Sequence, residues 1–378
     1  MNIGVINESL KIENRAGLSP SGVSFLVEKG HKVFIQAGAG LKAGYSNEDF
    51  VSLGAQIVFT KEEVFGRSDV VLNISPLNQE ECALVKENQI LLGFHHLAVA
   101  KKNIVEELIK KNVTMIGYEI VEDEEEDLPF ISSLSEIAGQ MCHAISGHYL
   151  QSCYGGRGLI MGGVVSVPPA TAVIVGSTIL ARSAIKAMIG AGAHTIALGR
   201  YMDKLKELEE MTSGRLVTLM ASNYNLQRMC EIADILIGAV LRPGKRAPMM
   251  ITREMVKKMK KGSIIIDLSI DQGGCIETSH PTSLEHPTFM EEGVIHYCVP
   301  NITSAVSRTS TKLLSNLVIP YLLQIGEFGI DEALKRNQAL CCGVYMYKKS
   351  LVKKNIAERF NLPYKKLSFE QESGKNLS

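Results

Sequence analysis

The stretch Thr171-Ala-Val-Ile-Val-Gly-Ser-Thr-Ile-Leu-Ala181 decides the fold, because it joins an apolar strand directly to a helix through a glycine. Apolar residues then recur at helical spacing, at Ile179, Leu180, Ala184, Ala187, Met188 and Ala191. A second apolar run, His194 to Leu198, follows. This order predicts a βαβ unit, and the N-terminus of its helix is a favourable position for the pyrophosphate of a dinucleotide.

The glycine pattern of this unit departs from the usual dinucleotide-binding sequence. That sequence is Gly-x-Gly-x-x-Gly/Ala, whereas the chain has Gly176-Ser-Thr178-Ile-Leu-Ala181. The middle glycine normally lets the backbone approach the pyrophosphate, and Thr178 places a branched side chain there. The acidic residue that would bind the adenosine ribose is replaced by Gly199-Arg200. We therefore expect weak or lost binding of NAD, with Arg200 able to pair with the 2′-phosphate of NADP.

Length and composition predict a water-soluble globular protein of two domains. The chain has 378 residues, of which 46% are hydrophobic and 21% charged. Forty basic residues balance forty acidic ones, which gives no reason to expect nucleic acid or an anionic membrane as a partner. The sequence shows no long apolar span or N-terminal leader, so we expect a cytoplasmic protein. Its eight cysteines lack Cys-x-x-Cys spacing and are expected to be reduced.

Strand and helix patterns alternate along the first third of the chain. Strands are expected at 2–7, 32–36, 56–59, 69–74, 89–93 and 114–117, and helices at 20–30, 47–53, 60–65, 78–87 and 101–111. This alternation predicts a parallel sheet covered by helices. Ligands of such sheets bind beyond the carboxyl ends of the strands, where Ser75-Pro76 and His95-His96 fall.

The second half of the chain repeats this organisation. A long helix is expected to begin at a Ser133–Glu136 capping box and to reach about Gln151. Beyond the βαβ unit, strands are expected at 216–220, 235–237 and 263–267, and helices at 202–211, 226–233 and 253–259. An apolar helix should run from Thr303 to about Gly326, and a helical, polar segment should follow it.

The predicted class is α/β, with two Rossmann-like doubly wound parallel-sheet domains joined by long helices. The expected domain boundaries place residues 1–133 and 304–378 in a catalytic, substrate-binding domain. Residues 134–303 form the dinucleotide-binding domain.

Six motifs spread over nearly the whole chain point to one family. They are Glu13-Asn-Arg15 with Ser19-Pro20, His96-Leu-Ala98, Ser135-Glu-Ile-Ala-Gly139, Gly238-Ala-Val-Leu241, Asp267-x-x-x-Asp271-Gln-Gly-Gly-Cys275 and Tyr297-Cys-Val-Pro-Asn301. In these motifs the chain resembles the alanine dehydrogenase family, which also includes the nucleotide-binding part of proton-translocating transhydrogenases. The resemblance implies reversible NAD(P)-dependent oxidative deamination of a small L-amino acid, such as alanine to pyruvate and ammonia.

The resemblance also implies the roles of particular residues. His96 and Asp271 match catalytic residues, and the expected substrate ligands are Arg15, Ser75 and Asn301. Arg15 would bind the substrate carboxylate, and His96 would face the keto oxygen. The expected cofactor-binding residues are Ser135, Gly176, Thr178, Ala181, Gly199, Arg200, Val240, Leu241 and Ile270. No metal is implied. Since His96 and Asp271 both follow strand ends, we expect them to meet across the cleft between the domains, with His95 as the outward neighbour.

Three ligand-binding positions, Ser75, Thr178 and Gly199, depart from the family pattern. Ser75 replaces a lysine that helps to hold the substrate carboxylate, and Asn73 replaces a second lysine common in the family. Together with Thr178 and Gly199, the loss of this lysine leaves a second interpretation of the function open. In that alternative the protein is a diverged, non-oxidoreductase or binding-only member with impaired dinucleotide binding. A transhydrogenase subunit is the weaker option, because the sequence shows no membrane segment.

The expected partners are a small 2-oxo or 2-amino acid and further copies of the chain. Similar dehydrogenases are hexamers and the transhydrogenase relatives are dimers. The helices near 135–151 and 303–326 carry much apolar surface. We therefore expect a homo-oligomer, with a hexamer favoured and a dimer as the alternative.

Overall fold

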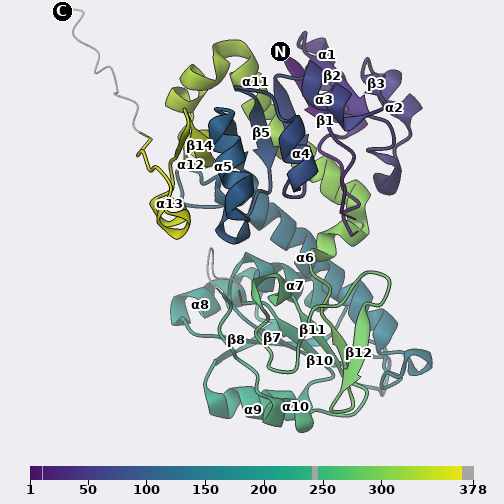
Figure 1. Ribbon diagram of the computed structural model, residues 1–378. Coiled ribbons are helices and arrows are strands. Elements are labelled where there is room, and N and C mark those ends of the chain that lie inside the picture. Colours follow the sequence, from purple (N-terminus) through teal and green to yellow (C-terminus); the bar gives the residue numbers. More distant parts are fainter. Residues whose placement is uncertain (11, 241–245, 368–378) are drawn as a thin grey trace, which may run out of the picture. The chain divides into compact units, whose positions relative to one another are not determined.

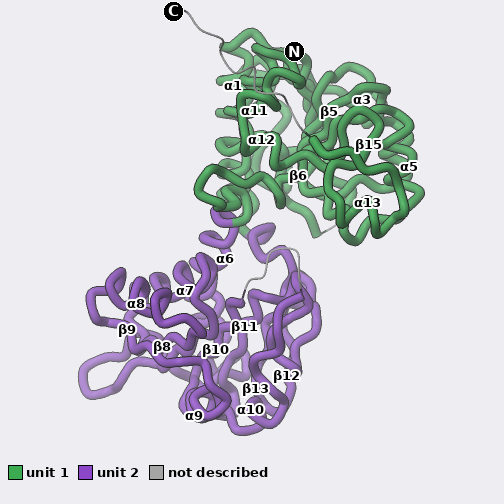
Figure 2. Tube along the Cα trace, turned by 90° about the vertical axis from the view of Figure 1, so that its left-hand side faces the viewer, with its two compact units in different colours: residues 1–131, 306–378 green, residues 132–305 purple. Residues whose placement is uncertain are grey.

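The protein, seen here as a computed structural model, is described over residues 1–10, 12–240 and 246–367. The chain divides into two compact units, which Figure 2 distinguishes by colour. Unit 1 consists of Met1–Ile131 and Val306–Ser378, and unit 2 of Ser132–Ala305.

Unit 1 contains an eight-stranded sheet in the order β15-β14-β6-β5-β4-β1-β2-β3 (Figure 1). The six strands from the first third of the chain are all parallel: β1 (Asn2–Val5), β2 (Lys32–Gln36), β3 (Gln56–Val58), β4 (Val70–Asn73), β5 (Ile90–Gly93) and β6 (Thr114–Gly117). β14 (Val344–Tyr347) and β15 (Ser350–Leu351) add an antiparallel pair next to β6. Central strands such as β4 and β5 are buried along their whole length, because helices cover both faces.

The helices of unit 1 are α1 (Pro20–Glu28), α2 (Asn47–Val51), α3 (Lys61–Arg67), α4 (Gln79–Leu84), α5 (Lys102–Lys110), α11 (Ser307–Arg336), α12 (Gln338–Cys342) and α13 (Lys354–Phe360). Five of them, α1, α2, α3, α4 and α12, begin at a residue whose side chain caps the helix. Ser46, Thr60 and Asn78 form reciprocal capping boxes with the acidic residue three positions later. Such boxes satisfy two backbone groups that a helix end otherwise leaves unpaired.

Unit 2 contains a seven-stranded sheet in the order β12-β13-β11-β10-β7-β8-β9. Its strands are β7 (Thr171–Val175), β8 (His194–Gly199), β9 (Leu216–Met220), β10 (Ile235–Gly238), β11 (Ile264–Asp267), β12 (Thr288–Glu291) and β13 (Val294–Tyr297). All pairs are parallel except β12 with β13. The flanking helices are α7 (Ile179–Gly190), α8 (Met202–Met211), α9 (Asn223–Ile232) and α10 (Arg253–Lys257). The chain order therefore reverses beside β7, and the predicted doubly wound α/β class is confirmed.

Several expectations about individual elements were wrong. The polar C-terminal segment contains β14 and β15, and the last strands of unit 2, β12 and β13, were not predicted. The long helix α6 (Pro129–Tyr149) begins at Pro129, so Ser133 lies inside it and forms no capping box. Proline suits the first turn of a helix, where its missing N–H group has no partner to lose. α11 extends to Arg336 across a kink at Gly329, whose φ is 74°.

The helical stretch Ile302–Arg336 is long and apolar enough to cross a membrane by length and composition. This observation is weak, since core helices of water-soluble proteins pass the same test. Within the chain, 28% of its most apolar window is buried. Phe328, at 36%, is its exposed large apolar side chain among the described residues, and Leu313, Leu317 and Ile319 are partly buried.

Candidate functional site

Four polar side chains of unit 1 follow four neighbouring strands. The strands β6, β5, β4 and β1 are adjacent in the sheet. Their carboxyl ends lead to Glu119, His96, Ser75 and Glu8, respectively. Because the strands are parallel, these residues follow the same edge of the sheet. This edge is the candidate substrate site of unit 1.

Arg15 is held in a fixed orientation by Glu13. The Nε and Nη2 atoms of Arg15 each donate to one carboxylate oxygen of Glu13 at 2.7 Å. The backbone N–H of Arg15 also donates to Glu13, at 2.9 Å. Arg15 is 5% and Glu13 3% exposed, so the pair is buried. This bidentate ion pair fixes the orientation of the guanidinium before a substrate carboxylate binds to it.

His96 lies at a strained turn that directs its ring outward. Its φ and ψ are 45° and 44°, in the left-handed region. Glu119 holds this turn, because its carboxylate accepts the N–H groups of His95 at 3.2 Å and of His96 at 2.6 Å. The Tyr345 hydroxyl donates to the same carboxylate at 3.0 Å. The side chain of His96 remains 52% exposed, and its Nδ1 lies 3.8 Å from Glu119. Backbone strain of this kind often marks functional sites.

The expectation that His95 points outward was wrong. His95 is 3% exposed, and desolvation lowers the pKa of its imidazole to about 4. Strand alternation fails here because β5 ends at Gly93, and the left-handed residue His96 reverses the expected direction of the side chains.

Ser75 lies beside a carboxylate that the sequence did not single out. The N–H groups of Ile74 and Ser75 donate to the two oxygens of Glu8 at 2.6 and 2.9 Å, and the Ser75 hydroxyl also hydrogen-bonds to Glu8. Burial, opposed by these hydrogen bonds and helped by the charge of Glu13, raises the pKa of Glu8 to about 7. Glu8 therefore changes charge near neutral pH at the candidate substrate site.

The raised pKa of Glu8 predicts a loss of stability as the pH rises. The folded protein keeps a proton on Glu8 up to about pH 7, whereas the unfolded chain releases it near 4.5, the usual pKa of a glutamate side chain. Between these values the folded state binds more protons, so raising the pH favours unfolding. We expect the free energy of unfolding, relative to Glu8→Gln, to fall by about 2 kcal/mol from pH 5 to pH 7.5 in urea denaturation. A difference that stays constant with pH would contradict this assignment.

In unit 2, Gly176 forms a tight turn at the end of β7, and the segment from Gly176 to Ala181 is called the cradle below. Its φ is 140°, a conformation that residues with a side chain rarely adopt. A Cβ atom at this position would lie 2.1 Å from the carbonyl oxygen of Ala239. The first glycine of the cradle is therefore required by backbone packing.

Thr178 occupies the N-cap of α7 without capping it. Its hydroxyl donates to the carbonyl of Ala239 at 3.4 Å, and it makes no hydrogen bond to the first turn of α7. Among the described residues, no side chain caps the first N–H groups of α7, and such groups suit an anion like a dinucleotide pyrophosphate. Ala181 is fully buried in the first turn.

α6 packs closely against α7 next to Ser135. The Ser183 hydroxyl donates to the carbonyl of Glu136 at 2.8 Å, and a Cβ on Gly139 would lie 2.5 Å from the Cβ of Ser183. Ser135 itself is 8% exposed. These contacts place Ser135 on the helix that adjoins α7.

The end of β8 offers a cation where a carboxylate is usual. Gly199 ends β8, and a Cβ there would meet the side chain of Leu205 at 2.9 Å. Arg200 is exposed, and its Nη2 lies 3.1 Å from Sδ of Met250. Residues 199 and 200 therefore supply a positive charge and no carboxylate at the end of β8.

Hydrogen bonds fix the loop that carries Asp271. The buried carboxylate of Asp267, at the end of β11, accepts the N–H groups of Ser269 at 3.0 Å and Cys275 at 3.1 Å. The Ser269 hydroxyl accepts the N–H of Val240 at 3.0 Å and donates to its carbonyl at 2.8 Å. Between these anchors, Ile270 is 5% exposed. The expected ligand Leu241 lies outside the described residues.

Asp271 and Asn301 are brought together in unit 2. The exposed Asp271 accepts the N–H of Asn301 at 3.0 Å through Oδ1, and Asn301 adopts a φ of 51°. The meeting of His96 with Asp271 stays a prediction. In the described ranges 1–10, 12–240 and 246–367, no group of three or more His, Cys, Asp or Glu side chains is placed to hold a metal ion. All eight cysteines are free.

Sequence reasoning missed two residues of unit 1. Glu8 and Glu119 contact the predicted residues Ser75 and His96, but neither was assigned a role. Both follow the carboxyl ends of parallel strands, which was the signal that selected Ser75 and His96.

The fold and these sites define a two-unit α/β protein with a dinucleotide-type cradle in unit 2 and a basic and acidic site at the strand ends of unit 1. Family models for the alanine dehydrogenase/PNT N-terminal and C-terminal domains match residues 4–138 and 142–354. The chain belongs to this alanine dehydrogenase/PNT family, as its motifs predicted.

Individual relatives agree over nearly the whole chain. The chain is 40% identical over 365 residues to alanine dehydrogenase of Methanococcus maripaludis, covering 96% of this chain and 98% of that protein. It is 38% identical over 366 residues to alanine dehydrogenase 2 of Staphylococcus aureus, covering 97% and 98%. A solved L-alanine dehydrogenase superimposes with a TM-score of 0.91 at 37% identity, covering 96% of this chain and 99% of that one. A Sinorhizobium meliloti transhydrogenase, at 18% identity and a TM-score of 0.81, shares the fold and covers 93% and 100%.

Proposed function

We propose that the protein is a nicotinamide-dependent oxidoreductase that interconverts a small L-amino acid and its 2-oxo acid, with alanine and pyruvate as the substrate pair. The observation that carries this proposal is the 40% identity to an alanine dehydrogenase over 96% of the chain. The oriented Arg15 and the exposed His96 of unit 1 supply groups that this chemistry needs.

The residues have complementary roles in the proposed reaction. Arg15, oriented by Glu13, binds the substrate carboxylate. His96 donates a hydrogen bond to the keto oxygen and exchanges a proton with it, and Asp271 positions the water that adds to the imine carbon when the amino acid is oxidised. Asn301, hydrogen-bonded to Asp271, orients that carboxylate. In the proposed reaction, His96 of unit 1 and Asp271 of unit 2 act on the same substrate.

The cradle of unit 2 fits a nicotinamide dinucleotide, which supplies hydride exchange at the substrate Cα when bound. The uncapped start of α7 suits its pyrophosphate, and Gly176, Thr178 and Ala181 form the turn that precedes it. Gly199 provides no acceptor for the ribose hydroxyls, so we propose weakened NAD binding and tolerance of the NADP phosphate beside Arg200.

Two measurements test this proposal. The first follows nicotinamide fluorescence during titration with NADH and NADPH, and we expect saturable binding of at least one. The second follows cofactor oxidation with pyruvate, glyoxylate and longer 2-oxo acids in the presence of ammonium, and we expect turnover with pyruvate. Cofactor binding without turnover on any of these acids would favour a diverged, binding-only member of the family.

Replacing Ser75 with lysine should strengthen substrate binding. The added ammonium would lie at the candidate substrate site, beside the carboxylate of Glu8. We expect the KM for pyruvate to fall about tenfold or more with a modest change in kcat. The reason is that the added charge would bind the substrate equally well in the ground state and in the transition state. Ser75→Met is the matched control, because it adds length without charge. Equal KM values for the two variants would show that the charge has no role there.

We also propose that the protein is a cytoplasmic homo-oligomer, with a hexamer favoured over a dimer. Support comes from α11, because its apolar residues Leu313, Leu317 and Ile319 are only partly buried within one chain. Light scattering at micromolar concentration should therefore give a mass well above 41.3 kDa, the mass of one chain. A mass equal to that of one chain would contradict the proposal.

A further inference from the structure

The residue that ends β8 lies where a bound dinucleotide presents its adenosine ribose. β8 pairs with β7 in the unit 2 sheet (Figure 1), and in a doubly wound fold the end of this second strand faces the ribose hydroxyls. Here that residue is Gly199, which is buried. A Cβ at Gly199 would lie 2.9 Å from Cδ2 of Leu205 and 3.3 Å from Cβ of Ser177, and Leu205 is itself 3% exposed. A carboxylate side chain at position 199 would therefore displace a core residue.

Arg200, the next residue, has no carboxylate partner among the described residues. Its Nη2 donates to Sδ of Met250 at 3.1 Å, which is the one hydrogen bond of its side chain in that part of the chain. Neighbouring cations of unit 2 differ, because Arg182 and Lys204 both pair with Glu207, at 2.9 and 2.8 Å. Arg200 is exposed, so its remaining N–H groups are open to an anion. A guanidinium forms its strongest hydrogen bonds with carboxylate and phosphate.

Met250 orients this guanidinium without neutralising it. A thioether is an uncharged, weak acceptor, so it leaves the full positive charge on Arg200. Met250 is 8% exposed, and its backbone N–H donates to the carbonyl of Cys275 at 2.8 Å. The N–H of Cys275 in turn donates to the buried carboxylate of Asp267 at 3.1 Å. The sulfur atom is thus attached to a backbone that is tied to the end of β11, and Arg200 is held from this side.

The segments around this position carry a surplus of positive charge. They are the six residues that follow each of β7, β8 and β9, namely 176–181, 200–205 and 221–226. They contain two cations, Arg200 and Lys204, and one carboxylate, that of Asp203. Asp203 lies in the first turn of α8, where a carboxylate stabilises the helix. It is also the competing group, because an acidic side chain in this region can accept the ribose hydroxyls of NAD.

We propose that unit 2 selects NADP(H) over NAD(H), with Arg200 binding the 2′-phosphate and Met250 positioning Arg200. The 2′-phosphate carries close to two negative charges at neutral pH, and a guanidinium can bind it in a bidentate manner. NAD(H) has a neutral hydroxyl group at the same place and gains nothing from this cation. The selection rests on the dinucleotide binding proposed above, and it goes further because it makes NADP(H) the cofactor of this chain.

Binding measurements on the full-length protein without substrate test this selection. Calorimetry compares adenosine 2′,5′-bisphosphate with adenosine 5′-monophosphate, which differ in the 2′-phosphate alone, and nicotinamide fluorescence compares NADPH with NADH. Arg200→Gln removes the cation, and Met250→Leu removes the sulfur acceptor while keeping an apolar side chain of similar size. Arg215→Gln is the matched control, because Arg215 is an exposed arginine next to the amino end of β9, at the opposite edge of the sheet.

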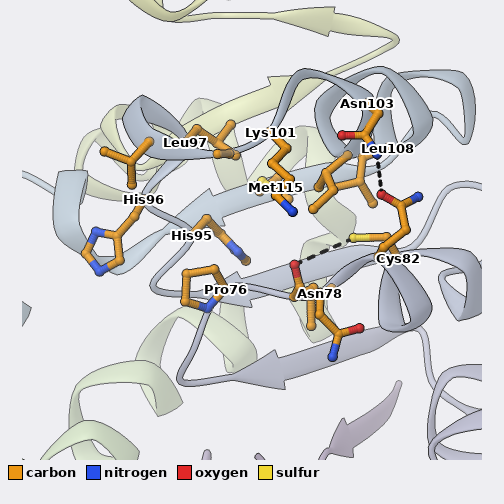
Figure 3. Close-up of a pocket in the computed structure, with 15 residues that line it drawn as sticks. Pro76, Asn78, Cys82, His95, His96, Leu97, Lys101, Asn103, Leu108 and Met115 are labelled. Carbon is orange, nitrogen blue, oxygen red and sulfur yellow. Dashed lines mark hydrogen bonds between the residues drawn. The ribbon is translucent and has the colours of Figure 1, made fainter. Parts of the chain in front are cut away.

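Lys101→Gln is the control for an anion site in the other unit. Lys101 lines a pocket of 530 Å³ in unit 1 together with His95 and His96 (Figure 3), and among the described residues it has no carboxylate partner either. Replacing it distinguishes a 2′-phosphate bound beside Arg200 from one bound at that pocket. Thermal unfolding verifies that all four variants are folded.

We expect NADPH to bind at least about tenfold more tightly than NADH, and the bisphosphate at least about tenfold more tightly than the monophosphate. Arg200→Gln should raise the Kd for NADPH about tenfold and change that for NADH by less than about twofold. Met250→Leu should raise the Kd for NADPH about threefold with the same small change for NADH, whereas a merely structural role would weaken both cofactors alike. Arg215→Gln and Lys101→Gln should match the wild type.

NADH binding as tightly as NADPH would overturn the proposal and leave Asp203 as the ribose ligand. Equal losses of NADPH and NADH in Arg200→Gln, no saturable binding of NADPH, or a loss in Lys101→Gln as large as in Arg200→Gln would also overturn it. An unchanged ratio of the two Kd values in Met250→Leu would contradict the positioning role of Met250. Turnover with NADH but not NADPH supports the proposed function and contradicts the selection. Selective NADPH binding without turnover on any 2-oxo acid supports the selection and contradicts the proposed function.

Discussion

His96→Ala should lower kcat for the reductive amination of pyruvate by about 10²–10⁴-fold, because it removes the group that exchanges a proton with the keto oxygen. The fold should survive, since the side chain of His96 is 52% exposed and its turn is held by backbone hydrogen bonds to Glu119. Steady-state kinetics with saturating cofactor, and NADH titration of the same variant, provide the measurement.

His143→Ala is the matched control, because His143 is an exposed histidine of α6 that has no proposed role in the reaction. It should keep wild-type turnover. An unchanged kcat in His96→Ala, with normal cofactor binding, would show that the histidine at this turn is not catalytic.

Gly176→Ala should destabilise the protein by about 2–4 kcal/mol and abolish dinucleotide binding. The added Cβ would lie 2.1 Å from the carbonyl oxygen of Ala239, and the backbone φ of 140° is unfavourable for alanine. Relief of this clash must move the turn between β7 and α7, where the pyrophosphate is expected to bind. Thermal unfolding and NADH fluorescence titration measure the two effects.

Gly190→Ala, at the last residue of α7, offers the comparison. No atom lies within 4 Å of a Cβ at Gly190, which is exposed near the end of α7. Alanine is favoured there by about 1 kcal/mol, so this variant should be as stable as the wild type or more stable. Similar losses in both variants would mean that the tight cradle is not the cause.

The parallel core of both units was readable from the sequence. The predicted strands 32–36, 114–117 and 216–220 coincide with β2, β6 and β9. Strands of a covered parallel sheet are buried on both faces, so they appear as continuous apolar runs separated by helical patterns. The predicted α8, at 202–211, also coincides with the observed helix.

The strands β12, β14 and β15 could not be read in the same way. β12 is only partly buried, and β15 has two residues, so neither gives a continuous apolar run. β14 is buried, but it follows the long helical region and pairs antiparallel with β6, a contact between distant parts of the chain. Its place depends on the tertiary structure more than on local pattern.

The candidate site shows the same limit. Glu8, Ser75, His96 and Glu119 are neighbours because β1, β4, β5 and β6 are adjacent in the sheet, and this order cannot be obtained by following the chain. The orientation of His95 and His96 depends on a left-handed residue that alternation does not predict. Motifs identified His96 and Arg15, whereas the residues that hold them required the structure.

The most direct test of the proposed function follows deuterium from [4-²H]NADH or [4-²H]NADPH into the amino acid product. With pyruvate, ammonium and the full-length protein, we expect mass spectrometry to find L-alanine that carries deuterium at Cα. Finding no deuterated alanine with either cofactor, labelled on either face of the ring, would contradict the assignment of this chain as an alanine dehydrogenase.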